Sequence, residues 1–228
     1  MLSKMLALLM TILSLSQSGI ARYEDQLSLG GNLFLINRDY RINADYVPND
    51  LVMPKVRRKN NSVLMREEAA HALEEMFDAA KEEKGYVLMA VSGFRSYQTQ
   101  RILHNRRIRA NGVKKANLYS APPGASEHQL GLAMDVGRLK NSKLNESFGH
   151  SKEGKWMAEN CYRFGFILRY KAEWTETTGY AYESWHIRYV GKEHAMRIKE
   201  LDIPLEDYIA ILRNGLDLAK EAAEDDIT

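Results

Sequence analysis

The sequence predicts an α+β domain, because its helical and extended segments follow one another without the regular β-α-β alternation of a parallel sheet. Three observations lead to this class. Residues Ser62 to Lys84 show helical periodicity, Tyr86 to Phe94 form an apolar run rich in strand formers, and the second half mixes short segments of both kinds. The 228 residues, 45% of them hydrophobic, suffice for one domain with a substantial core.

The charge and cysteine content exclude several classes of protein. The 32 basic and 30 acidic residues leave a formal charge of +2, so no nucleic-acid partner is expected. Cys161 is the single cysteine, which rules out an internal disulfide. It lies in a predicted helix, where a small buried thiol is the expected role.

The first 21 residues have the composition of a signal peptide. Lys4 precedes an apolar run from Met5 to Leu15, and small residues follow it. Cleavage after Ser18 or Ala21 fits this pattern. An uncleaved membrane anchor is the alternative, although the run is shorter than the roughly 20 residues of a spanning helix. We therefore expect export from the cytoplasm.

Residues 22–60 are predicted to form an extended arm, since Asn, Asp and Pro punctuate their short apolar pieces. The main domain, 61–228, begins with the helix Ser62 to Lys84, which is followed by Gly85. One face of this helix is apolar, which indicates a packing role. The residues of that face are Ala69, Leu73, Met76, Phe77 and Ala80.

A buried strand is expected at Tyr86 to Phe94, and a second helix at residues 96–112, which ends at Gly112. A basic concentration lies in and after this helix. A solvated face is the ordinary interpretation, and contact with an anionic polymer is the alternative. The basic residues are Arg106, Arg107, Arg109, Lys114 and Lys115.

The second half of the chain alternates between loops, strands and helices. A fixed loop is predicted at 117–128, a strand at 131–137, a helix at 150–165, and two strands at 166–170 and 184–191. Two helices, 192–203 and 204–226, end the chain, and Pro204 lies in the first turn of the second.

Three separated residues suggest a metal site. His128 and Asp135 lie seven residues apart around a glycine, and His186 is available in the segment AYESWHIRYVG. Two imidazoles and one carboxylate suit zinc, and three protein ligands leave a fourth position for water, as in catalytic sites. Glu183 could then serve as a general base. The alternative is that both histidines are hydrogen-bonded core residues.

Two motifs and a third segment resemble a known family. SEHQLGLAMD, ESWHIRY and SGFRSYQTQ are similar to segments of the VanY-type D-alanyl-D-alanine carboxypeptidases, with Phe94 in place of a tyrosine. The resemblance extends from about Asn32 to Leu212. It implies a single domain of the hedgehog/DD-peptidase type, with a central, mostly antiparallel sheet flanked by helices.

The resemblance also implies site residues and their roles. One zinc ion per chain would bind His128, Asp135 and His186, with Glu183 as catalytic base and Arg95 holding the substrate and the oxyanion. Ser184 replaces the family's usual proline, which frees the backbone beside Glu183. Residues implied to contact substrate or to wall the site are Ser126, Gln100, Tyr170 and Trp185.

The function implied is zinc-dependent removal of the terminal D-alanine from peptidoglycan stem peptides, outside the cytoplasmic membrane of a bacterium. Alternatives are an LD-carboxypeptidase acting on tetrapeptide stems, an endopeptidase, or a non-catalytic zinc-containing module that binds the cell wall. Stem peptides are the expected partners, and no specific protein partner is predicted. The protein would be attached to the membrane if the signal is not cleaved.

Overall fold

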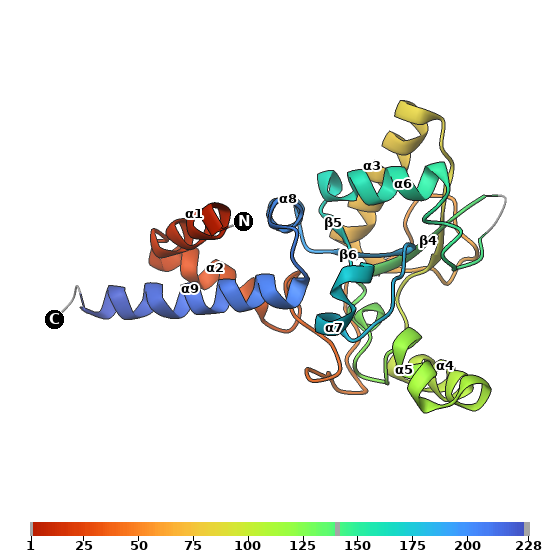
Figure 1. The fold of residues 1–228 in the computed structure, drawn as a ribbon, viewed down its shortest axis with the longest axis horizontal. Helices are drawn as coiled ribbons and strands as arrows, with labels where there is room; N and C mark the ends of the chain where they lie inside the picture. The colour runs from red at the N-terminus through yellow and green to blue at the C-terminus, as the bar shows by residue number, and fades with distance from the viewer. Residues whose placement is uncertain (1, 140–141, 226–228) are drawn as a thin grey trace.

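The computed structural model describes residues 2–139 and 142–225, and its centre is a four-stranded antiparallel sheet (Figure 1). The strand order is β3-β4-β6-β5. The strands are Leu88–Ser92 (β3), Ala133–Arg138 (β4), Phe166–Leu168 (β5) and His186–Tyr189 (β6). Helices flank this sheet, so the predicted α+β class with a mainly antiparallel sheet is confirmed.

Two helices, Glu67–Lys84 (α3) and Lys152–Asn160 (α6), lie together on one side of the sheet (Figure 1). Their apolar faces join the strands in the main hydrophobic core, which we name the sheet cluster. Cys161 begins the 3-10 turn Cys161–Phe164 (η2) and is buried, and burial raises the pKa of its thiol to about 12. This agrees with the predicted role as a buried thiol.

Helix α3 begins later than its sequence pattern predicts. Met65–Arg66 (β2) instead pairs antiparallel with Leu51–Val52 (β1), so the prediction of helix from Ser62 was wrong. Glu67 and Glu68 lie in the first turn of the helix, where acidic side chains favour a helix start. Gly85 ends the helix in the left-handed conformation, with φ of 70°.

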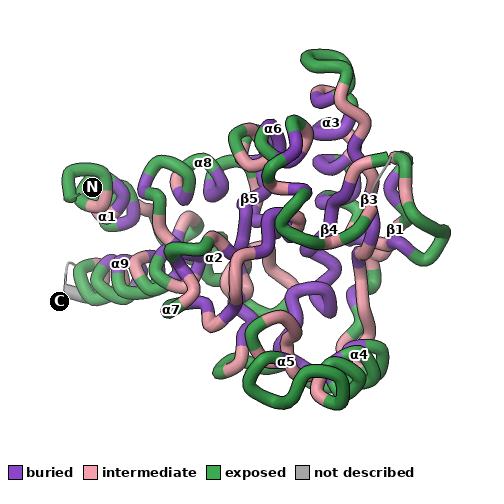
Figure 2. Tube along the Cα trace, turned by 45° about the vertical axis from the view of Figure 1, so that its right-hand side comes forward, coloured by how far each residue is buried: buried purple, intermediate pink, exposed green. Residues whose placement is uncertain are grey.

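Two exposed helices, Tyr97–Asn111 (α4) and Val113–Tyr119 (α5), project from the body of the molecule (Figure 2). We call residues 97–119 the wing. The Ser96 side chain caps α4 by accepting a hydrogen bond from the Thr99 amide at 3.2 Å. The loop predicted at 117–128 begins only after Tyr119, because α5 continues to that residue.

The chain termini form a second helical group. Leu2–Leu13 (α1) and Gln17–Leu27 (α2) pack against the long helix Leu205–Asp225 (α9), and Lys192–Leu201 (α8) joins them (Figure 1). Their buried apolar residues form what we name the helical cluster. The extended arm predicted from residue 22 was wrong as far as Leu27, and residues 28–60 are irregular apart from β1 and a bridge at Arg58.

No single described helix is long and apolar enough to cross a membrane. The bent pair α1 and α2 passes that test only when the two helices are taken together. Two further short helices, Ala172–Trp174 (η3) and Thr175–Thr178 (α7), connect β5 to β6.

Candidate metal centre and active site

Three side chains predicted to bind metal converge at one end of the sheet. Asp135 on β4 is the direct cross-strand partner of His186 on β6, so their side chains leave the same face. His128 comes from the 3-10 turn Glu127–Leu130 (η1), which precedes β4. One ligand atom from each of the three residues lies within 4.8 Å of the others, and all three side chains are buried.

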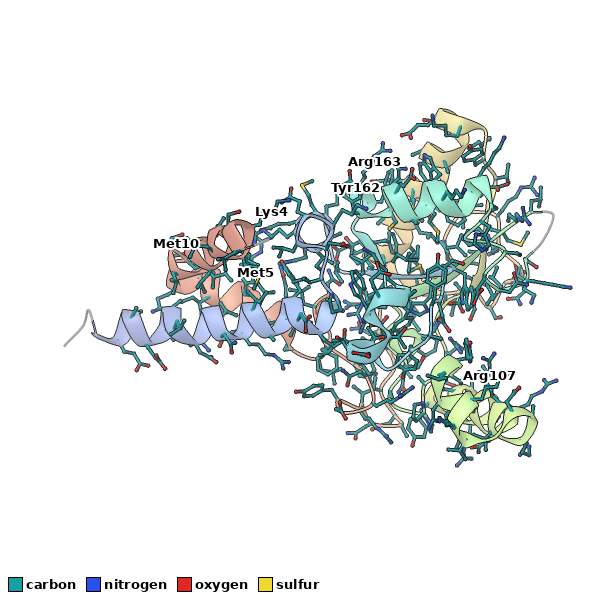
Figure 3. The ribbon with its side chains drawn as sticks, in the orientation of Figure 1. Lys4, Met5, Met10, Arg107, Tyr162 and Arg163 are labelled. Atoms are coloured by element: carbon teal, nitrogen blue, oxygen red, sulfur yellow. The ribbon has the colours of Figure 1, made fainter. Side chains whose placement is uncertain are left out.

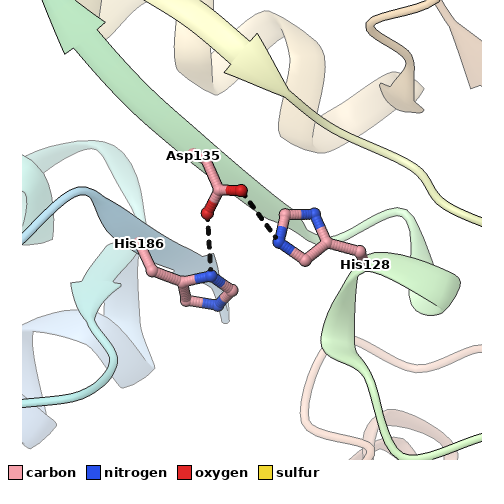
Figure 4. A group of neighbouring side chains, drawn as sticks. All are labelled: His128, Asp135 and His186. Atoms are coloured by element: carbon pink, nitrogen blue, oxygen red, sulfur yellow. Dashed lines mark hydrogen bonds and ion pairs between the residues drawn. The ribbon is translucent and has the colours of Figure 1, made fainter. Parts of the chain in front are cut away.

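Asp135 lies between the two imidazole rings, as Figure 4 shows. Its Oδ1 is 3.1 Å from His186 Nδ1, and its Oδ2 is 3.4 Å from His128 Nε2. The arrangement presents two ring nitrogens and a carboxylate to one small volume. These three groups can therefore coordinate one divalent cation.

The protonation of His128 provides a test of this interpretation. Its Nδ1–H donates to the carbonyl oxygen of Gly93 at 2.7 Å, which leaves the lone pair of Nε2 directed towards Asp135. That Nε2 is buried and forms no hydrogen bond. A lone pair facing a carboxylate without a proton between them needs a cation, so the site fits a metal ion.

Glu127, which was not among the predicted site residues, orients the second histidine. His186 Nε2 lies 3.2 Å from Glu127 Oε2, so its Nε2–H is held by that carboxylate and Nδ1 faces Asp135. The other Glu127 oxygen accepts from Arg169 at 2.8 Å and from Arg188 at 3.1 Å. All four groups are buried, and each is paired within the network.

The pKa values of these groups reflect burial opposed by close charges. Burial lowers the pKa of His128 to about 4, with the Arg95 charge acting in the same direction. Burial also lowers that of His186, but hydrogen bonds to Asp135 and Glu127 outweigh it and raise the pKa to about 9. Burial opposes ionisation of Asp135, yet the adjacent histidines hold its pKa well below the usual range.

Glu183 lies beside the three ligand residues. Its Oε2 is 3.9 Å from His186 Nδ1, and its amide donates to the Tyr170 carbonyl at 3.0 Å. Burial raises the pKa of its carboxyl to about 7, which suits a group that accepts and returns a proton near neutral pH. Ser184, at the position where proline was expected, is buried at 2% exposure.

Arg95 follows β3 and reaches the same place. Its backbone amide donates to the His128 carbonyl at 3.1 Å, and its guanidinium lies 3.9 Å from Asp135 Oδ2. The guanidinium also donates to Gln100 Oε1 at 3.0 Å, while Gln100 Nε2 donates to the Ala121 carbonyl at 2.7 Å. Gln100 therefore uses both ends of its amide within the protein and holds Arg95 in position.

The residues expected to contact substrate line a cleft of about 820 Å³ that opens from the metal centre. Tyr170 is buried, and its ring centroid lies 4.9 Å from that of His186. A cleft of this size accommodates several residues of a peptide. The predicted residues in its lining are Arg95, Gln100, Ser126, His128, Asp135, Tyr170, Glu183, Trp185 and His186.

Comparison with known families and proteins agrees with this geometry. The family model described as VanY, D-alanyl-D-alanine carboxypeptidase, matches residues 62–192. Among curated proteins, YodJ of Bacillus subtilis (strain 168) is 46% identical over 181 residues, which cover 77% of this chain and 66% of that protein. The chain spans less than two thirds of the length of each of the first three curated relatives, at 66%, 59% and 65%.

Two solved structures are similar over most of this chain. The LdcB LD-carboxypeptidase is 45% identical with a TM-score of 0.72, over 77% of this chain and 84% of that chain. The vancomycin resistance D,D-pentapeptidase VanY from the VanB-type cassette, solved with Zn(II), is 33% identical with a TM-score of 0.64. That match covers 78% of this chain and 98% of the other.

Proposed function

The chain belongs to the VanY family of D-alanyl-D-alanine carboxypeptidases, and on that premise we propose that it is a zinc-dependent carboxypeptidase that removes the terminal D-alanine of peptidoglycan stem peptides. One observation carries the proposal: His128, Asp135 and His186 converge at the base of a cleft that also contains Glu183 and Arg95. This combination supplies a metal site, a proton acceptor and a fixed positive charge around one reacting bond.

The residues divide the chemistry between them. Zinc held by His128, Asp135 and His186 would polarise the scissile carbonyl and lower the pKa of a water molecule to about 7. Glu183 takes a proton from the attacking water and delivers it to the nitrogen of the leaving amino acid. Arg95, held by Gln100, donates N–H groups to the negative charge that develops on the carbonyl oxygen.

A second candidate is an LD-carboxypeptidase that acts on tetrapeptide stems. The observation that favours it is the greater similarity of this chain to the LdcB structure than to the VanB-type VanY, in both identity and TM-score. The two candidates share every step of the chemistry. They differ in which residue the cleft accepts next to the leaving D-alanine.

The test is incubation of the zinc-loaded protein with defined pentapeptide, tetrapeptide and tripeptide stems, with products identified by mass. Loss of one D-alanine from the pentapeptide is the expected result. Cleavage of only the tetrapeptide would support the second candidate, and an internal cut would indicate an endopeptidase. Binding of stems without release of any amino acid would instead identify a non-catalytic wall-binding module.

We also infer that the protein acts outside the cytoplasmic membrane, because its proposed substrate is located there and because Lys4 and the apolar run after it are typical of export signals. Cell fractionation followed by N-terminal sequencing tests this inference. Recovery in the cytosol would contradict it. A mature N-terminus near residue 19 or 22 would identify a cleaved signal, and an intact one in the membrane fraction would identify an anchor.

A further inference from the structure

The wing differs in charge from the rest of the molecule. Residues 97–119 contain six Lys and Arg residues and no Asp or Glu, whereas the whole chain contains 32 basic and 30 acidic residues. The residues outside the wing together therefore carry a net negative charge. The six basic residues are Arg101, Arg106, Arg107, Arg109, Lys114 and Lys115.

One face of α4 forms a wall of the catalytic cleft. The cleft is lined by residues of α4 at helical spacing, so one stripe of the helix follows the cleft outwards from the metal centre. Gln100 marks the inner end of this stripe, since it contacts Arg95. The members of the stripe are Gln100, Leu103, Arg106, Arg107, Ala110 and Asn111.

The segment at the end of α5 holds this wall in place. Gln100 Nε2 donates to the Ala121 carbonyl at 2.7 Å, His104 Nδ1 lies 3.1 Å from the Ser120 carbonyl, and Arg107 donates to the Tyr119 carbonyl at 3.2 Å. The Arg107 guanidinium also lies 6.0 Å from the centre of the Tyr119 ring. Figure 3 shows Arg107 on the wing. Its charge is therefore held at the cleft by two contacts.

The positive charge at this wall is not neutralised within the described residues. Across residues 2–139 and 142–225, no carboxylate forms an ion pair with Arg106 or Arg107. Glu127 binds Arg169 and Arg188, and Asp135 contacts the two histidines. Glu183 forms no ion pair with Arg106 or Arg107, although the charge of Arg107 is close enough to act against the rise of the Glu183 pKa. Glu146 is also in the lining, and within the described residues it forms no ion pair with either arginine.

We propose that Arg106 and Arg107 form a carboxylate-binding subsite that selects peptides with a free acidic group on the third residue before the scissile bond. The six or seven residues from Gln100 to these arginines correspond to about 10 Å along the helix axis. An extended peptide covers that distance in about three residues, at roughly 3.3 Å each. A guanidinium pair suits a carboxylate, because it donates several hydrogen bonds in a planar fork.

This subsite rests on the proposed function, because it names the substrate that the carboxypeptidase prefers. The experiment uses two synthetic stem pentapeptides that differ at one group, a carboxylate or a carboxamide on the third residue before the scissile bond. The kcat/KM of each peptide is measured with the zinc-loaded wild type and with the double variant Arg106→Gln, Arg107→Gln. We expect the wild type to prefer the acidic peptide about tenfold, mainly through KM, and the double variant to lose that preference.

Matched controls come from the same wing. Arg109→Gln with Lys114→Gln removes the same charge from positions outside the cleft lining, and the acid-to-amide ratio should remain at the wild-type value. Equal kcat/KM values of the wild type for the two peptides would overturn the subsite. It would also be overturned if the control variant lost the preference for the acidic peptide as fully as the double variant does, because that result would indicate a general effect of the positive charge. Calorimetric binding of the two peptides gives the same comparison if neither is hydrolysed. In that case the proposed function fails, while a tenfold difference in Kd would still support the subsite.

Discussion

The sheet cluster and the helical cluster are both well packed, but they differ in what is buried beside their apolar side chains. The sheet cluster lies against buried ionisable groups, Asp135, Glu127, Arg169 and Arg188, which are paired with one another and with the site histidines. The helical cluster contains mainly aliphatic contacts and a few hydrogen bonds. We therefore expect substitutions beside the sheet cluster to affect catalysis, and substitutions in the helical cluster to affect stability alone.

The largest expected effect comes from Glu183 at the edge of the sheet cluster. Glu183→Gln keeps the size of the side chain but removes its ability to take a proton, so kcat should fall about 10²–10⁴-fold. Zinc content, measured by elemental analysis, should stay at one ion per chain. Ile209→Val in the helical cluster is the control and should keep kcat within about twofold of the wild type. Full D-alanine release by the Glu183→Gln protein would exclude this residue as the base.

Zinc removal should destabilise the protein through the sheet cluster. A ligand that binds only the folded state stabilises it by about 4 kcal/mol when present at 1,000 times its Kd. Chelation should therefore lower the melting temperature of the wild type by several degrees, and zinc should restore it. His128→Ala should show no such response, because one of the three ligands is missing. An unchanged melting temperature after verified metal removal would contradict the assigned site.

The helical cluster can be tested at Ile12, which is fully buried and packs against the backbone of α9 at Gly215. In the full-length chain, with residues 1–21 retained, Ile12→Ala should lower the free energy of unfolding by about 2–5 kcal/mol through the cavity it leaves, with kcat unchanged. Leu6→Ala on the same helix is the control, since Leu6 is 54% exposed and should cost less than about 0.5 kcal/mol. Urea titration measures both. Equal effects for the two variants would mean that α1 does not pack as the structure has it.

The three candidate metal ligands could be predicted from the sequence, and the structure brings them together, because their spacing and chemistry are local to two short segments. The sequence did not identify Glu127, whose role depends on reaching His186 across 59 residues of chain and on two arginines from other strands and turns. The signal was present, since Glu127 directly precedes His128. Its role becomes clear only from the folded chain, in which the turn that carries Glu127 lies against His186 on β6.

Two of the incorrect boundaries have a similar cause. Residues 22–27 were assigned to an extended arm, but Tyr23 is buried in the helical cluster beside α8, and that packing supports helix there. Ser62 and its neighbours were assigned to α3, but β2 pairs with β1 and delays the helix start to Glu67. In both places tertiary contacts outweighed the local propensity on which the predictions depended.

The smallest expected effect is on the pH dependence of stability in the helical cluster. His194 in the helical cluster is buried between the Tyr208 hydroxyl and Gln26 Oε1, each 2.8 Å from a ring nitrogen. Burial lowers its pKa to about 4, with Glu193 opposing that shift and Arg197 and Arg22 adding to it. The unfolded chain takes up the proton near pH 6.5, and the folded protein only near pH 4. The contribution of neutral His194 to the free energy of unfolding is therefore complete above pH 6.5 and is lost as the pH falls from 6.5 to 4.

Linkage gives a loss of about 2 kcal/mol between pH 7.5 and pH 5 for a histidine with these two pKa values. His194→Gln cannot take up this proton, so its free energy of unfolding should fall by about 2 kcal/mol less than that of the wild type over the same range. His150→Gln changes an exposed histidine and should reproduce the wild-type slope. If His194→Gln and the wild type lose stability in parallel, acid sensitivity originates in the buried carboxylates of the sheet cluster, and the helical cluster contributes packing without any pH response.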